Sequence, residues 1–420
     1  MRLLAIALAL VSVPGLAAGQ SPGTTENGRR QTFEGVEAAT RAWTEAVRTH
    51  RAGRIDEPLR TVAAWPPDQV NGVLPGLLAR LRQLLERSDD AASTEVTALA
   101  ALLTRGLSLH TDIALAERDA LAERSATKGG TAILLRDGQE VKRVDRSRHW
   151  VRARQIAAAL AAVPGERPRT LAWYRAIANG LQAGGDYDLA AVHLAQAVAS
   201  FADDALLRLY QGTLHQAMGD PRLEPHVRRA ASRGMEIARI TGNERPEWSR
   251  TSELRYVPPP ARRQLEAAAR EFRRAIAADP AVPEARIRLA HVLGALGDDQ
   301  EAAAAVRPVL AAPLAPFLEF YAGMVLGRAE EHLARYPEAG AAYARAAAMF
   351  PSAPSARIGR SRAALGEGRV ADALAVITEI TTAGSVADDD PWLRYLQHHE
   401  PDGPSMLEAW RASLPPGDDR

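Results

Sequence analysis

The chain of 420 residues contains no cysteine. No disulfide can brace the fold, although an exported protein would be free to form one, so stability has to come from packing. Lipid attachment at a leader cleavage site is excluded too, because that modification needs a cysteine there. Lysine is nearly absent, with only Lys128 and Lys142, so arginine carries almost all of the positive charge.

Long hydrophobic runs are also missing. The apolar run over 3–13 is too short to span a bilayer, which requires roughly 20 residues. Arg2 precedes this run, and Pro14, Gly15 and small residues follow it, which is the layout of a secretory signal peptide. We therefore expect a signal peptide over 1–19, a disordered leader over 20–31, and a mature protein in the periplasm or secreted, without a membrane span.

Neither an excess of charge nor clear strand patterns are present. Lys plus Arg is 52 and Asp plus Glu is 51, and a net charge of +1 argues against nucleic acid as a partner. The one strand-like stretch is 131–144, where Asp137-Gly138 favours a two-residue β-hairpin turn. An exposed loop explains this stretch equally well.

One set of four spaced residues occurs twice with identical spacing. The first copy is Ala268, Phe272, Ala275 and Pro280, and the second is Ala339, Tyr343, Ala346 and Pro351. In each copy the alanines and the ring share one face of a helix. The alanines let a neighbouring helix approach closely, the ring fills the gap beside them, and the proline ends the helix. A Gly-Asp pair such as Gly297-Asp298 marks a tight turn between two helices.

These residues resemble the tetratricopeptide repeat, a 34-residue helix–turn–helix unit whose Leu-Gly position is matched by Leu326-Gly327. The resemblance implies an all-α fold, an α-solenoid of antiparallel helix pairs. Repeat units are expected at about 171–204, 205–238, 283–316, 320–353 and 354–386.

The expected organisation follows from this repeat pattern. The parts are an N-terminal helical region over 32–165, a repeat block over 166–240, an irregular connection over 241–260, a second block over 261–386, and capping helices over 387–420. Three consecutive prolines, 258–260, forbid a helix in the connection. Leu407, Trp410 and Leu414 share one helix face, which we expect to cover the last repeat.

Catalytic and metal-binding patterns are scarce. His398 and His399 point apart on a helix, and the acidic runs at Asp203-Asp204 and Asp388–Asp390 stand where carboxylates cap helices. No nucleophile elbow, phosphate loop or zinc-binding motif is present. The sequence therefore predicts no cofactor, no metal and no enzyme activity.

The resemblance implies that the first helices of the repeats line a concave groove that binds peptides. The positions carried over predict a peptide-binding set of Arg175, Asn179, Gln182, Leu209, Thr213, Gln216, His291, Tyr321, Arg328, Glu331 and Arg362. The function that follows is an exported scaffold or adaptor with a protein or peptide partner.

Two alternatives stay open. One is an enzyme, or an enzyme-associated substrate-binding protein, with a site near 110–180 built on His149-Trp150 or on His110 and Asp112. The other is a self-associating structural protein of the cell envelope. The oligomeric state and the partner are not encoded in any motif.

Overall fold

The computed structural model describes residues 67–87, 90–127, 148–220, 261–382, 390–396 and 403–414. The expected signal peptide (1–19), leader (20–31), hairpin (131–144) and connection (241–260) lie outside the described residues. The chain divides into two compact units, Met1–Leu99 with Gly417–Arg420, and Ala100–Pro416. The described elements are all helical.

The first unit contains α3 (Pro67–Leu85) and the start of α4 (Asp90–Thr127). Leu78, Leu81 and Leu84 recur at helical spacing on α3 and are buried. The Arg80 guanidinium donates to both carboxylate oxygens of Glu95, at 2.8 and 2.7 Å. This bidentate pair ties α3 to α4.

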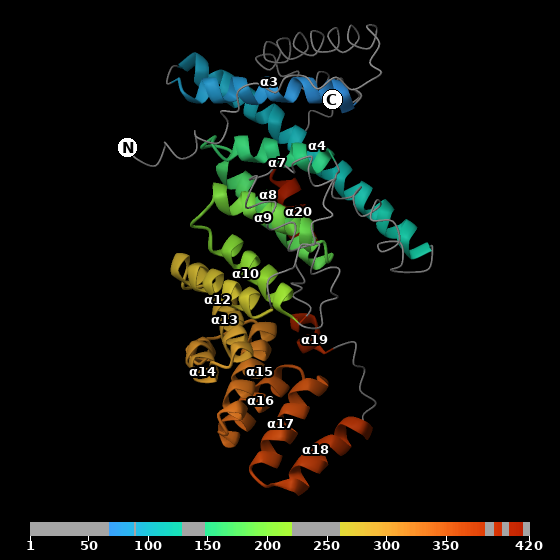
Figure 1. Cartoon of the computed structure of the whole chain (residues 1–420), viewed down its shortest axis with the longest axis vertical. Helices are drawn as coiled ribbons and strands as arrows, with labels where there is room; N and C mark the ends of the chain where they lie inside the picture. The colour runs from blue at the N-terminus through green and yellow to red at the C-terminus, as the bar shows by residue number, and fades with distance from the viewer. Residues whose placement is uncertain are drawn as a thin grey trace. The chain divides into compact units, whose positions relative to one another are not determined.

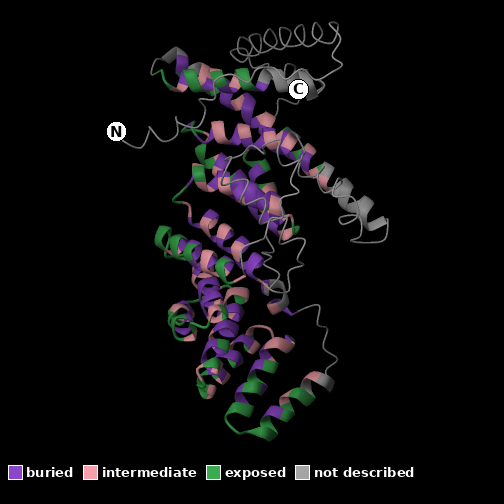
Figure 2. Ribbon diagram, viewed as in Figure 1, coloured by how far each residue is buried: buried purple, intermediate pink, exposed green. Residues whose placement is uncertain are grey.

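The second unit is an all-α solenoid of antiparallel helix pairs, in which successive helices pack against one another (Figure 1). Its helices, after the rest of α4, are α7 (Arg148–Leu160), α8 (Arg167–Ala183), α9 (Tyr187–Ser200), α10 (Ala205–Gly219), α12 (Ala261–Ala278), α13 (Pro283–Leu296), α14 (Asp299–Val306), α15 (Pro316–His332), α16 (Tyr336–Met349), α17 (Pro354–Gly366), α18 (Val370–Thr382), α19 (Pro391–Leu396) and α20 (Gly403–Ala412). Buried residues run along the contacts between these helices, with exposed residues on their outer faces (Figure 2).

The stripes of small and aromatic residues form the core, as the sequence predicts. All six alanine and ring positions of the two copies are at most 1% exposed. The turn between α13 and α14 is also as expected, because Gly297 ends α13 with φ +94°, a conformation that glycine adopts without strain.

The sequence does not predict the pairing of α10 with α12. The sequence leaves α12 without a preceding partner helix and gives α10 no second helix of the usual pattern. The structure packs α10 directly on α12, across the intervening residues 220–260. The Phe272 ring of α12 fits where a side chain at Gly212 of α10 would stand. Within the second unit, the helices from α7 to α18 therefore form one continuous stack.

The tyrosine ring of the second copy lies between two glycines. A Cβ on Gly359 of α17 would stand 2.5 Å from Tyr343 Cδ1, and one on Gly327 of α15 would stand 2.7 Å from the same atom. Both glycines are buried, so the close approach of α15 and α17 to the ring depends on their missing side chains.

We expect the Gly359→Ala substitution to lower the free energy of unfolding by about 1–3 kcal/mol, because the added methyl overlaps a ring that is enclosed on both sides. Gly340→Ala is the matched control. Its Cβ would meet nothing closer than Ala363 Cβ at 3.7 Å, so the alanine should be neutral or stabilising by up to about 1 kcal/mol. Urea denaturation of both variants tests the difference; equal effects would show that the ring does not require the glycine.

Helix α20, which carries Leu407, Trp410 and Leu414, does not cover the last repeat, so that expectation is wrong. Helix α19 packs on α15 and helix α20 packs on α8, far back along the stack. Trp410 of α20 is buried, Arg411 donates to Asp112 at 2.6 Å, and Tyr210 donates to the Met406 sulfur at 3.7 Å. The last repeat instead keeps apolar side chains exposed on α17 and α18, namely Ile358, Leu365, Val370, Leu374 and Ile377.

Candidate functional site

The groove face, defined as the surface formed by α8, α10, α13, α15 and α17, carries all the predicted peptide-binding residues. It holds a pocket of about 430 Å³ between α15 and α17, which we call the C-terminal pocket. Its lining residues are Met324, Arg328, Glu331, His332, Tyr343, Ser355, Ile358, Arg362 and Trp392. Those on α15 and those on α17 follow helical spacing, so two neighbouring helix faces make the two walls.

Glu331, Arg362 and Tyr343 form a hydrogen-bonded network at this pocket. Arg362 Nη2 donates to Glu331 Oε2 at 2.7 Å and to the Tyr343 hydroxyl oxygen at 3.2 Å. The Tyr343 hydroxyl donates to Glu331 Oε2 at 2.8 Å. Burial, with the Glu331 charge beside it, raises the pKa of Tyr343, so the hydroxyl stays protonated. In this network the negative charge of Glu331 and the positive charge of Arg362 neutralise each other.

Arg328 stands apart from this network. It lines the pocket and is exposed, and no described residue forms an ion pair with it. His332, one turn further along α15, lies 3.0 Å from Asp299. The pocket thus offers a guanidinium in water beside the apolar walls of Met324 and Ile358.

The predicted residues on α8 and α10 are mostly buried and bonded within the stack. Gln182 Nε2 donates to the Tyr210 carbonyl at 3.0 Å, and Thr213 Oγ1 donates to the Leu209 carbonyl at 2.8 Å. Asn179, Gln182, Leu209 and Thr213 border a gap of only about 10 Å³, room for no more than one water. These side chains hold helices together at this point of the face.

Arg175 also has a structural partner. It pairs with Asp204, whose carboxylate accepts from the Leu207 amide and so caps the start of α10. The ion pair therefore holds α8 to the start of α10. Reversing the Arg175 charge would disturb this cap as well as any ligand contact.

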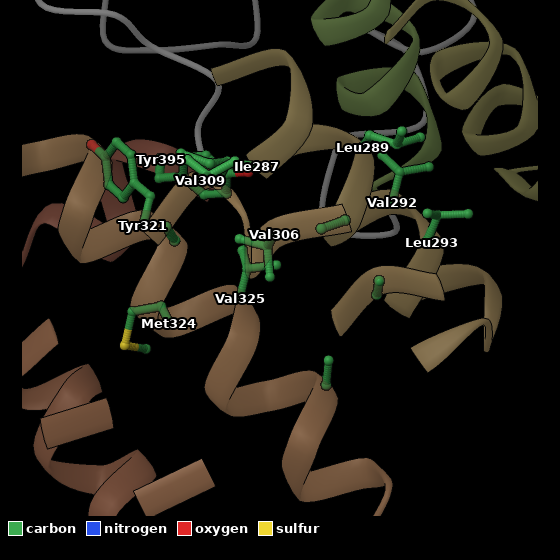
Figure 3. Close-up of a cluster of buried hydrophobic side chains, with 14 of the residues drawn as sticks. Ile287, Leu289, Val292, Leu293, Val306, Val309, Tyr321, Met324, Val325 and Tyr395 are labelled. Atoms are coloured by element: carbon green, nitrogen blue, oxygen red, sulfur yellow. The ribbon is translucent and has the colours of Figure 1, made fainter. Parts of the chain in front are cut away.

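The middle of the groove face is occupied by helix α19 of the same chain. Tyr395 of α19 is fully buried, and its ring lies 4.4 Å from the ring of Tyr321 and 5.4 Å from that of His291. Figure 3 shows Tyr395 beside Tyr321 at the edge of the hydrophobic cluster. Gln216 contacts His291, with its Nε2 2.9 Å from His291 Nδ1.

The predicted set thus separates into three parts. Arg328, Glu331 and Arg362 line the open C-terminal pocket. His291 and Tyr321 contact Tyr395 of α19, and Gln216 contacts His291. The α8 and α10 members are engaged inside the stack. The sequence analysis missed Trp392 and Tyr395, whose i, i+3 spacing on a short helix was the available signal.

The residues considered for an enzyme site lie in different surroundings. His110 and His149 face each other with their Nδ1 atoms 2.9 Å apart, while Asp112 binds Arg411 of α20. Burial, then the charges of His149 and Arg152, lower the pKa of His110 to about 4. Among the described residues no group of three or more His, Asp or Glu side chains could hold a metal ion. No described helix combines the length and apolar character that crossing a membrane requires.

Comparison with known proteins places the chain in no family. No family model matches it, and no curated protein matches it. Two solved structures, one titled MamA MSR-1 C2 and one of a MamA point mutant, are each 16% identical to it. They align over 50% of this chain and 95% and 96% of their own, with TM-scores of 0.34 and 0.33. At this level the likeness identifies neither a family nor a function.

Proposed function

We propose that this protein is a non-enzymatic scaffold or adaptor that binds a protein segment along its groove face, in the periplasm or outside the cell. The observation that carries the proposal is the C-terminal pocket beside α19. A helix of the chain is already seated on this face by its aromatic side chains, and the adjoining pocket of about 430 Å³ is lined by apolar and charged groups. A partner segment can therefore be held by the same kinds of contact.

Arg328 is the residue we assign to the partner's charge. It is the exposed cation of the pocket whose charge no described residue neutralises, whereas Arg362 is paired with Glu331. A partner with a carboxylate near an apolar side chain would place the carboxylate at Arg328 and the apolar group against Met324 and Ile358. This arrangement predicts an acidic, amphipathic partner segment.

The Arg328→Glu substitution should weaken capture of the partner in a cross-linking pull-down from cell-envelope extract by at least tenfold, because it replaces attraction with repulsion in a partly enclosed site. Far-UV circular dichroism should stay unchanged, since Arg328 is exposed. Arg263→Glu, at an exposed arginine on α12 outside the pocket, is the matched control and should leave capture as it is. Equal capture by the Arg328→Glu and Arg263→Glu variants would show that the partner does not bind at the C-terminal pocket.

The two alternatives stay predictions. Self-association has one observation in its favour, the exposed apolar side chains of α17 and α18 that α20 leaves uncovered. The enzyme alternative has the paired histidines His110 and His149, but Asp112 is engaged with Arg411 and not with them. Light scattering over a dilution series tests self-association, and a panel of hydrolase substrates tests the enzyme alternative.

A further inference from the structure

The contact of α19 with the groove face begins at Asp390, directly before the helix. This carboxylate is 3% exposed. It accepts from the Ser355 amide and the Ser355 hydroxyl, each at 2.9 Å, and also from the Trp392 amide at 2.9 Å. Ser355 stands in the first turn of α17, where unpaired backbone amides favour an anion. One carboxylate therefore caps α19 and attaches it to α17.

The second contact is an aromatic one, centred on Tyr395. Its ring is enclosed by Tyr321 at 4.4 Å and by Trp392 at 5.1 Å, with ring planes 38° and 17° away from parallel. The Arg288 guanidinium lies over the ring, 4.7 Å from its centre, and Arg288 is itself held by Glu284. Arg288 is 1% exposed, so this cation–π contact lies out of water, where it is strongest.

The third contact joins α19 to the open pocket. Trp392 is half-buried, with its ring 5.6 Å from His291, and it also lines the C-terminal pocket. The α19 seat, defined as Arg288, His291, Tyr321 and Ser355, is therefore continuous with the pocket assigned to the partner. A partner segment in the pocket would therefore contact α19 at Trp392.

The length of α19 indicates that this contact is made by side chains and not by an independently stable helix. The helix spans only Pro391–Leu396, below the length at which an isolated helix is stable in water. Its helical form depends on the seat, and another short helix with the same anchors could take its place. The seat thus recognises a carboxylate, an aromatic ring two residues later and a second ring three residues after that.

We propose that residues 390–396 are an internal ligand of the groove face, and that a partner helix carrying the pattern acidic–x–aromatic–x–x–aromatic displaces them. This rests on the proposed function, and it names the partner's chemistry. Because the segment is tethered to its seat, its effective concentration is on the order of millimolar, which keeps weak competitors out. A partner must match the three anchors, or gain further contacts in the C-terminal pocket, to displace it.

The test uses the full chain and a fluorescein-labelled peptide of its own residues 388–398. The unsubstituted chain should bind this peptide weakly, because the seat is filled. The variant Trp392→Ala/Tyr395→Ala loses both anchors of its own segment and should bind the peptide at least tenfold more tightly by fluorescence anisotropy. Adding Tyr321→Ala to that variant should remove the gain, since it takes away the receiving ring.

Three further comparisons separate docking from loss of structure. Glu408→Ala changes an exposed residue of the same C-terminal segment, on α20, and should leave peptide affinity as it is. Asp390→Ala keeps both rings and should raise affinity less than the double variant does. A peptide with both aromatic residues replaced by alanine should bind none of the variants.

An affinity that is the same for the unsubstituted chain and the folded double variant overturns the inference, as does a gain that survives Tyr321→Ala. The outcome is independent of the partner experiment. If Arg328→Glu weakens partner capture while the double variant gains no peptide affinity, the proposed function stands and the internal ligand does not. If the peptide results hold while Arg328→Glu has no effect, the seat stands and the pocket assignment fails.

Discussion

The Phe272→Ala variant should be less stable than the parent by about 3–5 kcal/mol. Phe272 is fully buried, and its ring occupies the space above Gly212, in the contact between α10 and α12. Removing the ring leaves a cavity at the contact that joins the stack across residues 220–260. The two helices cannot close the gap without shifting against both neighbours, so little of the loss should be recovered by relaxation.

Urea denaturation followed by far-UV circular dichroism measures this loss. Leu374→Ala is the control, because Leu374 is also a large apolar side chain but is 62% exposed, and its truncation should change stability by no more than about 0.5 kcal/mol. Equal midpoints for the two variants would mean that α12 does not pack on α10 through this ring.

Acidification should destabilise the second unit strongly. His193 is fully buried against Trp173 and Tyr174, and burial, then the Arg154 charge, lower its pKa to about 3. The pKa of His110 falls to about 4. Both bind a proton near pH 6.5 in the unfolded chain but only at much lower pH in the folded one. Stability is therefore complete above about pH 6.5 and declines as the pH falls towards 4, by roughly 1.4 kcal/mol per pH unit for each histidine.

The measurement is the urea midpoint between pH 7.5 and pH 4.5. Burial also lowers the pKa of His215. His193→Gln removes one of these buried protonation sites, so its stability should fall less steeply with pH than that of the parent, by roughly 1.4 kcal/mol per unit. Leu374→Ala, at an exposed side chain that binds no proton, should follow the parent profile. Parallel profiles for the parent and His193→Gln would falsify the assignment of this acid sensitivity to the buried ring.

Much of the fold could be predicted because it depends on local spacing. The stripe at Ala268, Phe272 and Ala275 is a property of one helix, and a turn such as the one at Gly297 is a property of a few neighbouring residues. Within the site, the sequence also predicted that Arg328 and Arg362 lie on the first helices of their repeats, which are α15 and α17. The sequence could not predict that Arg362 is paired while Arg328 has no ion-pair partner among the described residues. The pairing of Arg362 with Glu331 joins two different helices.

The placement of the C-terminal helices shows why the rest could not be predicted. The apolar face of α20 has the pattern of a cap, and nothing in its own residues distinguishes the last repeat from α8 as the surface it covers. The residues of α19 do not indicate its place either. The carboxylate of Asp390 binds α17, and the ring of Tyr395 contacts α15 and α13.

By itself the sequence determined the helices, their buried stripes and the close approach that small side chains allow, since each of these depends on residues within one or two turns. The tertiary structure alone decided that α10 pairs with α12, and that α19 returns to fill the middle of the groove face. Contacts between residues distant in the chain depend on shape and charge matching across surfaces, which exist only once the helices have packed.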